Sequence, residues 1–198
     1  MRRLSIIGLA LLMAGCVGVN NGSPGPTSKS SPGASRAPTA SPAAGEIGED
    51  LGPFACGFPH SFQGSTDRAQ ISSIVSGPHP GFDRMVFEFQ GLGALAVPSI
   101  DFKVASSPFA QDPSGLPLEV SGKSFIVMSM HASTVDANGQ PTYTGTKDFT
   151  PGLPTLQELA LAGDFEALST WIIGLSHPAC VRITAFESPN RLVIDMGK

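Results

Sequence analysis

The chain has 198 residues, a formal net charge of −4 and three cysteines. All 16 acidic residues but only 8 of the 12 basic ones follow residue 44, so this larger part of the chain carries a formal charge of −8. That balance excludes broad electrostatic binding to nucleic acid or to other phosphate-rich polymers. The roughly 150 residues after the N-terminal segments are enough for one domain with its own hydrophobic core.

The first 15 residues have the pattern of a signal peptide. Arg2 and Arg3 precede an apolar run that is too short to span a bilayer as a mature helix, and the run leads into Gly15 and Cys16. This junction resembles the lipobox of bacterial lipoproteins, which implies cleavage after Gly15 and acylation of Cys16, with enough acyl chains for stable anchoring. The alternatives are an ordinary secretory signal with a chance cysteine and a short signal anchor. We therefore expect an extracytoplasmic protein that is attached to the cell membrane through Cys16.

A linker is expected to separate this anchor from the folded domain. Residues 17–44 are dense in Gly, Ser, Pro, Thr and Ala and contain no run that could enter a core. A flexible coil of this length reaches about 30 Å, and prolines extend it further. The sequence thus predicts three parts: a signal peptide (1–15), the lipidated cysteine with a disordered linker (16–50), and one domain (51–198).

Cys56 and Cys180 lie near opposite ends of this domain. In an oxidising compartment two remaining cysteines most often pair, so a Cys56–Cys180 disulfide is expected. A metal site is the alternative, but no other cysteine and no histidine at ligand spacing accompanies either residue. We predict no metal and no cofactor.

The domain is predicted to be all-β, an antiparallel β-sandwich. Short segments with alternating apolar side chains are separated by turns rich in Gly and Pro, a pattern typical of sandwiches and barrels. The predicted strands are residues 69–75, 82–89, 100–104, 126–131, 169–173, 181–186 and 191–196. Residues 155–165 are ambiguous, because Thr155 and Glu158 fit a capping box and Leu156 and Leu159 fit one helical face. The local pattern there predicts a short helix.

Two of the predicted strands carry complementary charges on the faces expected to be in water. In one antiparallel register, Arg84 faces Asp195. The same register sets Glu88 against Arg191, and each such pair contributes about 0.2–1 kcal/mol. A parallel arrangement would instead bring the two arginines together. The charges therefore predict antiparallel neighbours; side chains that are each solvated singly are the alternative.

Three blocks of sequence follow in order: GFDRMVFEF from Gly81, GDFE from Gly163 leading to WIIGL from Trp171, and PNRLVID from Pro189. Together they resemble the AMIN-like domain of bacterial, notably actinobacterial, lipoproteins, over residues 68–196. The resemblance implies a non-catalytic β-sandwich in which residues 156–165 form a strand, and we prefer this to the helix. Related AMIN domains occur beside cell-wall amidases and direct them to peptidoglycan or to the division machinery.

No motif of an enzyme is apparent. The sequence contains no G-x-S-x-G, H-E-x-x-H, C-x-x-C or P-loop pattern. His60, His79, His131 and His177 show no spacing typical of a zinc site. We therefore expect a protein without catalytic activity.

The candidate binding residues are His79, Asp83, Arg84 and Trp171. Asp83 and Arg84 lie at the mouth of the first hairpin, where such a pair more often caps the turn. Trp171, the only tryptophan, could stack on a sugar ring, although a lone tryptophan in an apolar strand more often belongs to the core.

The function expected from these features is that of a binding module at the cell envelope. It would recognise peptidoglycan or an envelope protein through its polar sheet face and the loops around residues 77–83 and 138–146. One alternative is a small-ligand carrier or an envelope hydrolase with a site between the sheets. Another is an accessory lipoprotein that acts only by assembling with other proteins.

Overall fold

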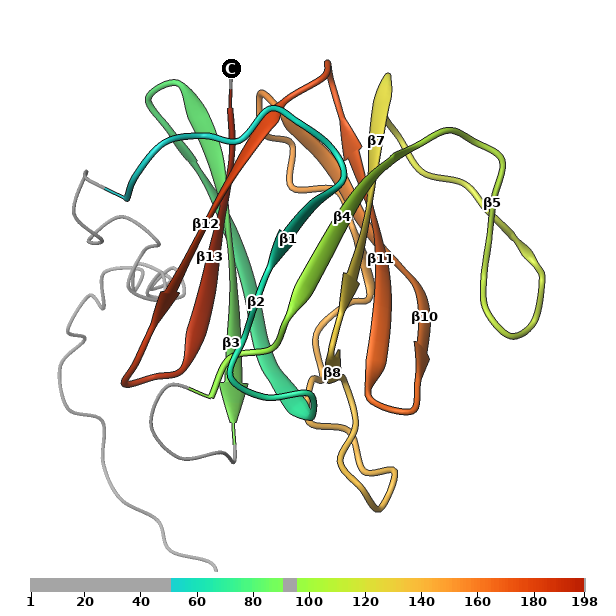
Figure 1. Ribbon diagram of the computed structural model, residues 1–198. Helices are drawn as coiled ribbons and strands as arrows, with labels where there is room; N and C mark the ends of the chain where they lie inside the picture. Colours follow the sequence, from blue (N-terminus) through green and yellow to red (C-terminus); the bar gives the residue numbers. More distant parts are fainter. Residues whose placement is uncertain (1–50, 91–95, 198) are drawn as a thin grey trace, which may run out of the picture. The chain divides into compact units, whose positions relative to one another are not determined.

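The computed structural model describes residues 51–90 and 96–197. Within these residues all regular structure is β-strand, and two main sheets face each other (Figure 1). The predicted all-β sandwich is therefore confirmed. The predicted signal peptide, Cys16 and the linker lie outside the described residues. The part of the chain that is described contains no helix able to cross a membrane.

The larger sheet has six strands in the order β1-β4-β7-β11-β10-β9, and every neighbouring pair in it is antiparallel. In that order the strands are β1 (His60–Phe62), β4 (Ile100–Ala105), β7 (Ser124–Met130), β11 (Leu168–Leu175), β10 (Leu156–Phe165) and β9 (Asp148–Phe149).

The second sheet has five strands in the order β12-β13-β3-β2-β8. They are β12 (Cys180–Phe186), β13 (Arg191–Gly197), β3 (Phe82–Gln90), β2 (Ala69–His79) and β8 (Ala132–Ser133). Its pairs are antiparallel except for the short parallel contact of β2 with β8. A separate hairpin is formed by β5 (Phe109–Ala110) and β6 (Pro117–Leu118).

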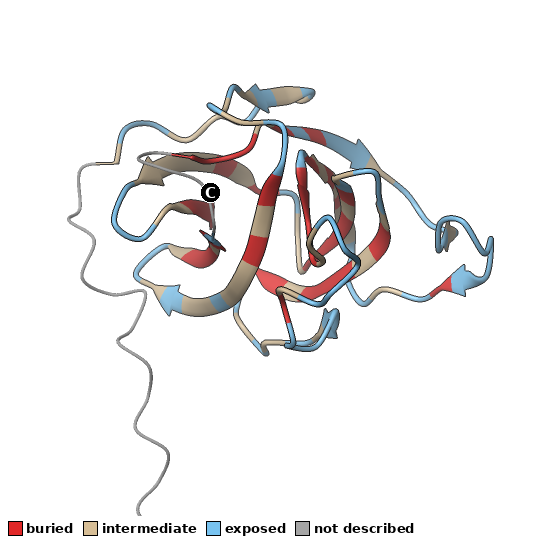
Figure 2. Ribbon diagram, turned by 90° about the horizontal axis from the view of Figure 1, so that it is seen from below, coloured by how far each residue is buried: buried red, intermediate tan, exposed pale blue. Residues whose placement is uncertain are grey.

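The main core lies between the two large sheets, where buried residues gather along the strands while most connecting loops are exposed (Figure 2). Trp171 of β11 is 0% exposed, and its ring meets Phe87 of β3 edge-on at 5.8 Å between centroids. A smaller apolar cluster on the other face of β10 and β11 includes Ala160, Ile172 and Leu118, so the β5–β6 hairpin covers that face. Burial on both faces explains why these two strands read as nearly continuous apolar runs.

The register predicted for β3 and β13 is confirmed. Val86 lies opposite Val193, and Arg84 lies opposite Asp195. The guanidinium of Arg84 donates to both carboxylate oxygens of Asp195, from Nε at 2.7 Å and from Nη2 at 2.9 Å. The expectation that this face is in water is wrong, because all four residues are buried.

The second predicted charge pair is only partly realised. Glu88 does lie opposite Arg191 in the register. No ion pair joins these two described side chains; instead the guanidinium carbon of Arg191 lies 5.4 Å from the ring centroid of Phe186. Among the described residues, Nε of Arg191 is buried without a hydrogen-bond partner. The pairing of the strands therefore does not depend on a bond between Glu88 and Arg191.

Residues 156–165 form strand β10, as the family resemblance implies, and the helix expected from the local pattern is wrong. The register shifts between Leu156 and Glu158, which indicates a β-bulge. The extra residue lets Leu156 and Leu159 both face the core although they are three positions apart. That spacing imitates one turn of a helix. Glu158 makes no capping box, since its carboxylate accepts a hydrogen bond from the backbone N–H of Ser121 at 2.8 Å.

The leading segment, residues 51–58, is attached to the edge of β12. Cys56 and Cys180 form the predicted disulfide, with an S–S distance of 2.01 Å. Next to it, Ala55 and Val181 exchange two backbone hydrogen bonds of 2.7 and 2.9 Å. A short piece of strand pairing thus continues the five-stranded sheet beyond β12 at this end.

Candidate binding site

Three of the predicted binding residues lie inside the domain. Asp83 is 1% exposed, and its Oδ2 accepts hydrogen bonds from the backbone N–H groups of Thr155 and Leu156 at 2.5 and 2.7 Å. The side chain of Arg84 is held by Asp195, and Trp171 is in the core. Asp83 thus connects the two sheets, Trp171 fills the space between them, and Arg84 lies in an ion pair within the five-stranded sheet. Their burial keeps all three side chains from a large ligand.

His79 is the fourth candidate, and it is half-buried at the end of β2. Its ring is stacked on that of Phe82, with centroids 4.9 Å apart and planes 3° apart. The loop of residues 77–83 belongs to this end of β2. Thr142, in the other proposed contact loop, donates its hydroxyl hydrogen to the carbonyl of Ile71 near the opposite end of β2. Since β2 has 11 residues, the two loops are roughly 30 Å apart and do not form one surface.

The face of β3, β13 and β12 that carries Arg84 forms a closed cluster. Asp195 also accepts hydrogen bonds from Nε and Nη2 of Arg182 at 3.0 and 2.6 Å, so one carboxylate serves two guanidinium groups. The guanidinium of Arg182 lies 4.5 Å from the ring centroid of Phe54 and 5.1 Å from that of Phe82. Cation–π contact therefore adds to the ion pairs. The cluster binds the leading segment to the sheet.

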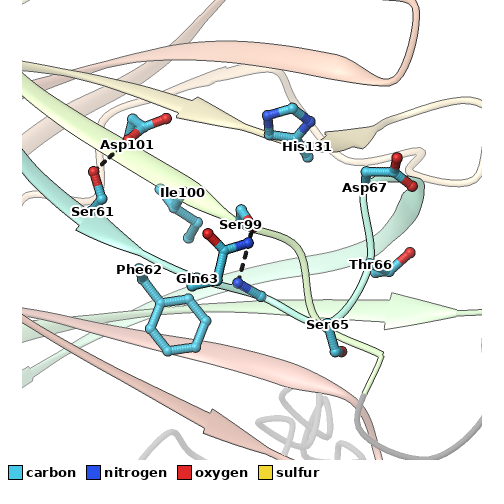
Figure 3. A pocket seen from close by; sticks show the side chains of 11 residues that line it. Ser61, Phe62, Gln63, Ser65, Thr66, Asp67, Ser99, Ile100, Asp101 and His131 are labelled. Carbon is cyan, nitrogen blue, oxygen red and sulfur yellow. Dashed lines mark hydrogen bonds between the residues drawn. The ribbon is translucent and has the colours of Figure 1, made fainter.

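A polar hollow of about 440 Å³ lies between β1, the segment that connects β1 to β2, and the start of β4. We call it the polar pocket; Figure 3 shows its lining side chains. Its polar lining includes Ser61, Gln63, Thr66, Asp67, Asp101 and His131. Asp101 and Asp67 lie at opposite sides of the pocket, with His131 between them in this view (Figure 3).

Pairing of β1 with β4 builds one side of the polar pocket. Ser61 lies opposite Asp101 in the register, and its hydroxyl donates to Oδ1 of Asp101 at 2.5 Å. The backbone N–H of His131 donates to the carbonyl of Ser99 at 3.0 Å, which places His131 beside the start of β4. Two strands and the end of β7 thus bring together residues up to 70 positions apart.

The floor and rim of the polar pocket are held by short contacts. The Ser99 hydroxyl accepts hydrogen bonds from the side-chain amide of Gln63 at 2.8 Å and from the backbone N–H of Gly64 at 3.0 Å. A Cβ atom at Gly64 would lie 2.2 Å from the carbonyl carbon of Pro98, so only glycine allows this close approach. The pocket is therefore formed before any ligand arrives.

The polar pocket offers groups for binding and shows no arrangement for catalysis. Ser61 donates to a carboxylate, and no histidine in the described part of the chain accepts its hydrogen. Across residues 51–90 and 96–197, no group of three His, Cys, Asp or Glu side chains could hold a metal ion. Within the same ranges, Asp67 and Oδ2 of Asp101 have no hydrogen-bond partner and face the hollow.

A second hollow, of about 320 Å³, lies beside the disulfide and is lined mostly by apolar groups. Val104 of β4 contributes to it and is 63% exposed, although it follows Phe102 on the core face of its strand. Ile126 and Phe58 form other parts of the wall. The lining of this hollow thus comes from both large sheets and from the leading segment.

Sequence reasoning noticed some residues of the polar pocket without bringing them together. The sequence presents His131 as a histidine without ligand spacing at the end of one alternating segment, and Asp101 as part of another. Ser61, Thr66 and Asp67 carry no pattern of their own. The signal that would have located them is the pairing of a three-residue strand with β4, which short local sequence does not encode.

Comparison with known proteins gives one finding. The AMIN-like domain family model matches residues 69–198, which is well over half of the chain. No curated protein and no solved structure matches the chain. The matched range includes the whole five-stranded sheet and all of the six-stranded sheet except β1.

Proposed function

The chain belongs to the AMIN-like domain family, whose members are extracytoplasmic, generally non-catalytic domains related to peptidoglycan and the cell envelope. On that premise we propose that this protein is a non-catalytic module that binds peptidoglycan through the polar pocket. Acylation of Cys16 would keep it on the membrane, and the linker would let the domain reach the wall. The observation that carries the proposal is the preformed pocket with two carboxylates free to accept hydrogen bonds.

The chemistry of the pocket suits a wall polymer. Peptidoglycan presents hydroxyl, amide and amino hydrogens along its glycan strands and peptides, and carboxylates accept these strongly. A pocket that opens to the surface can take a group that projects from an insoluble polymer. The acidic charge of the domain disfavours the phosphate-rich polymers that accompany peptidoglycan in many walls.

A carrier of small apolar molecules is supported less well. The apolar hollow beside the disulfide, at about 320 Å³, is near the lower limit of ligand pockets, which span about 300–1,000 Å³. An envelope protein as partner remains the alternative within the same class of function.

Co-sedimentation with purified sacculi tests the proposal. The full chain in mild detergent is mixed with sacculi stripped of teichoic acid, at about 0.5 M salt, where long-range charge effects are screened. We expect saturable binding that weakens about tenfold or more in Asp67→Asn/Asp101→Asn, because each lost charged hydrogen bond is worth about 1.5–3 kcal/mol. Binding no stronger than that of an unrelated acidic protein would refute the proposal.

A matched control is offered by the exposed acids Glu119 and Glu187, for which the structure gives no interaction. The variant Glu119→Gln/Glu187→Gln changes the net charge by the same amount as the pocket variant. It should bind like the original protein. Equal loss in both variants would show that overall charge, and not the pocket, governs binding.

A further inference from the structure

The polar pocket has a preference that follows from its hydrogen-bond inventory, and this inference rests on the proposed function. We propose that the pocket selects a free primary amino group, such as the side-chain amine of a wall peptide that is not cross-linked. It would then distinguish open peptide stems from those whose amine has been consumed in an amide cross-link.

Several hydrogen-bond donors of the polar pocket are already used within the domain. The hydroxyl hydrogen of Ser61 is committed to Oδ1 of Asp101, and the amide N–H of Gln63 to Ser99. Among the described lining residues, the carboxylate of Asp67 and Oδ2 of Asp101 have no hydrogen-bond partner, and the ring of His131 lies between them in the view of Figure 3. Ionised carboxylates accept hydrogen bonds and cannot donate them, so the ligand group that meets these two side chains must bring the hydrogens.

Asp67 and Asp101 also give the polar pocket negative charge. The basic residues nearest in sequence are Arg68 beside Asp67 and Lys103 two positions after Asp101, and neither forms an ion pair with those carboxylates. Two negative charges at opposite sides of one concave surface reinforce each other's attraction for a cation. An ammonium group supplies both the charge and three donors, whereas a neutral amide or hydroxyl supplies one or two donors and no charge.

The lining of the polar pocket also favours a wall peptide over a sugar ring. Recognition of a sugar ring commonly uses an exposed aromatic face, and the only aromatic carbocycle in the lining belongs to Phe62. That side chain is half-buried and packs against the main core. Trp171 and Tyr143 are buried elsewhere. In the described lining, the exposed ring is therefore only the small imidazole of His131, whereas two carboxylates carry charge, which favours the amine-bearing peptide.

Chemical acetylation of the wall gives a direct test. Sacculi are treated with acetic anhydride, which converts free amines to neutral amides, and esters are removed afterwards with hydroxylamine. The full chain in detergent should bind untreated sacculi at least about tenfold more tightly than acetylated ones, which corresponds to one lost charge-assisted hydrogen bond. The variant Asp101→Asn should bind both preparations equally and weakly, and Glu119→Gln should keep the full difference.

The outcomes separate this inference from the proposed function. Equal binding of the original protein to both preparations would overturn the amine preference while peptidoglycan binding stands. Binding to neither preparation would overturn the proposed function itself. Nα-acetyl-lysine, which has a free side-chain amine, should compete for binding, whereas the Nα,Nε-diacetyl form should not. Competition by both forms to the same extent would also overturn the preference.

Discussion

The carboxylate of Asp195 holds the five-stranded sheet and the leading segment together, so its removal is expected to be costly. Asp195 is 0% exposed and accepts four hydrogen bonds from two arginines, at 2.6–3.0 Å. In Asp195→Ala, the guanidinium groups of Arg84 and Arg182 lose the charge they share and remain close together. Removing one partner of a buried ion pair costs about 3–5 kcal/mol. We expect a loss in the upper half of that range, because one carboxylate balances two cations.

Urea unfolding of the full chain in detergent, followed by tryptophan fluorescence, measures this loss. Trp171 is the only tryptophan, and it lies in the core against the other sheet, so its signal reports global unfolding. A domain is typically stable by about 5–15 kcal/mol, so a loss of about 4–5 kcal/mol shifts the midpoint strongly.

The comparison variant is Arg182→Met, which leaves the one-to-one pair of Arg84 with Asp195 intact and keeps apolar contact with Phe54. We expect it to cost about 1.5–3 kcal/mol, the worth of a hydrogen bond to a charged group. If Asp195→Ala lowered the free energy of unfolding by less than about 1 kcal/mol, or by no more than Arg182→Met, the reasoning about a shared buried charge would be refuted.

Three further predictions concern stability. The replacement of Cys56 and Cys180 by alanine should lower the free energy of unfolding by about 2–5 kcal/mol, because the bridge joins positions 124 apart; an unchanged urea midpoint would contradict this. Partial burial raises the pKa of Asp148, and the charge of Glu158 and a hydrogen bond to it act in the same direction. The folded state therefore binds this proton more tightly than the unfolded state, and the free energy of unfolding falls as pH rises through the raised pKa. Asp148→Asn should therefore gain stability over the original protein as pH rises from about 3.5 to 7; a difference that stays flat or reverses in unfolding curves across that range would speak against the raised pKa. At the β10–β11 turn, Glu166 and Ala167 have φ of 51° and 62°, so replacing them by Asn-Gly should raise the unfolding free energy by about 1–2 kcal/mol; a lower midpoint would show that the native side chains contribute to the turn.

The pairing of β3 with β13 could be predicted because the charges of Arg84 and Asp195 are arranged along two alternating strands. The burial of that face could not be predicted in the same way. It is covered in part by Phe54 and Arg182, which come from the leading segment and from β12. Local alternation shows which residues share a face of a strand, but it does not show what a distant segment places over that face.

In strand β10, the local apolar pattern predicted the wrong type of element. Its bulge moves Leu156 and Leu159 onto the same face, so this strand shows the three-residue apolar spacing that is typical of a helix. Only the family resemblance predicted a strand there. Neither the local pattern nor the family resemblance predicted the polar pocket. Its residues, near 61–67, 99–101 and 131, meet only because β1 pairs with β4 and β7 ends beside them.

The disulfide also decides how mechanical load enters the domain. A pull on the chain from upstream of residue 51 first loads the weak contacts of Gly52 and Phe54, and at Cys56 the covalent bond passes it to Cys180, the first residue of β12. A pull along β12 then loads all seven register pairs with β13 at once, which resists more force than opening them one at a time. The three-residue strand β1, at the outer edge of its sheet and beside the polar pocket, is spared from being peeled away first. The pocket can thus keep its shape while the chain that leads to it is under tension.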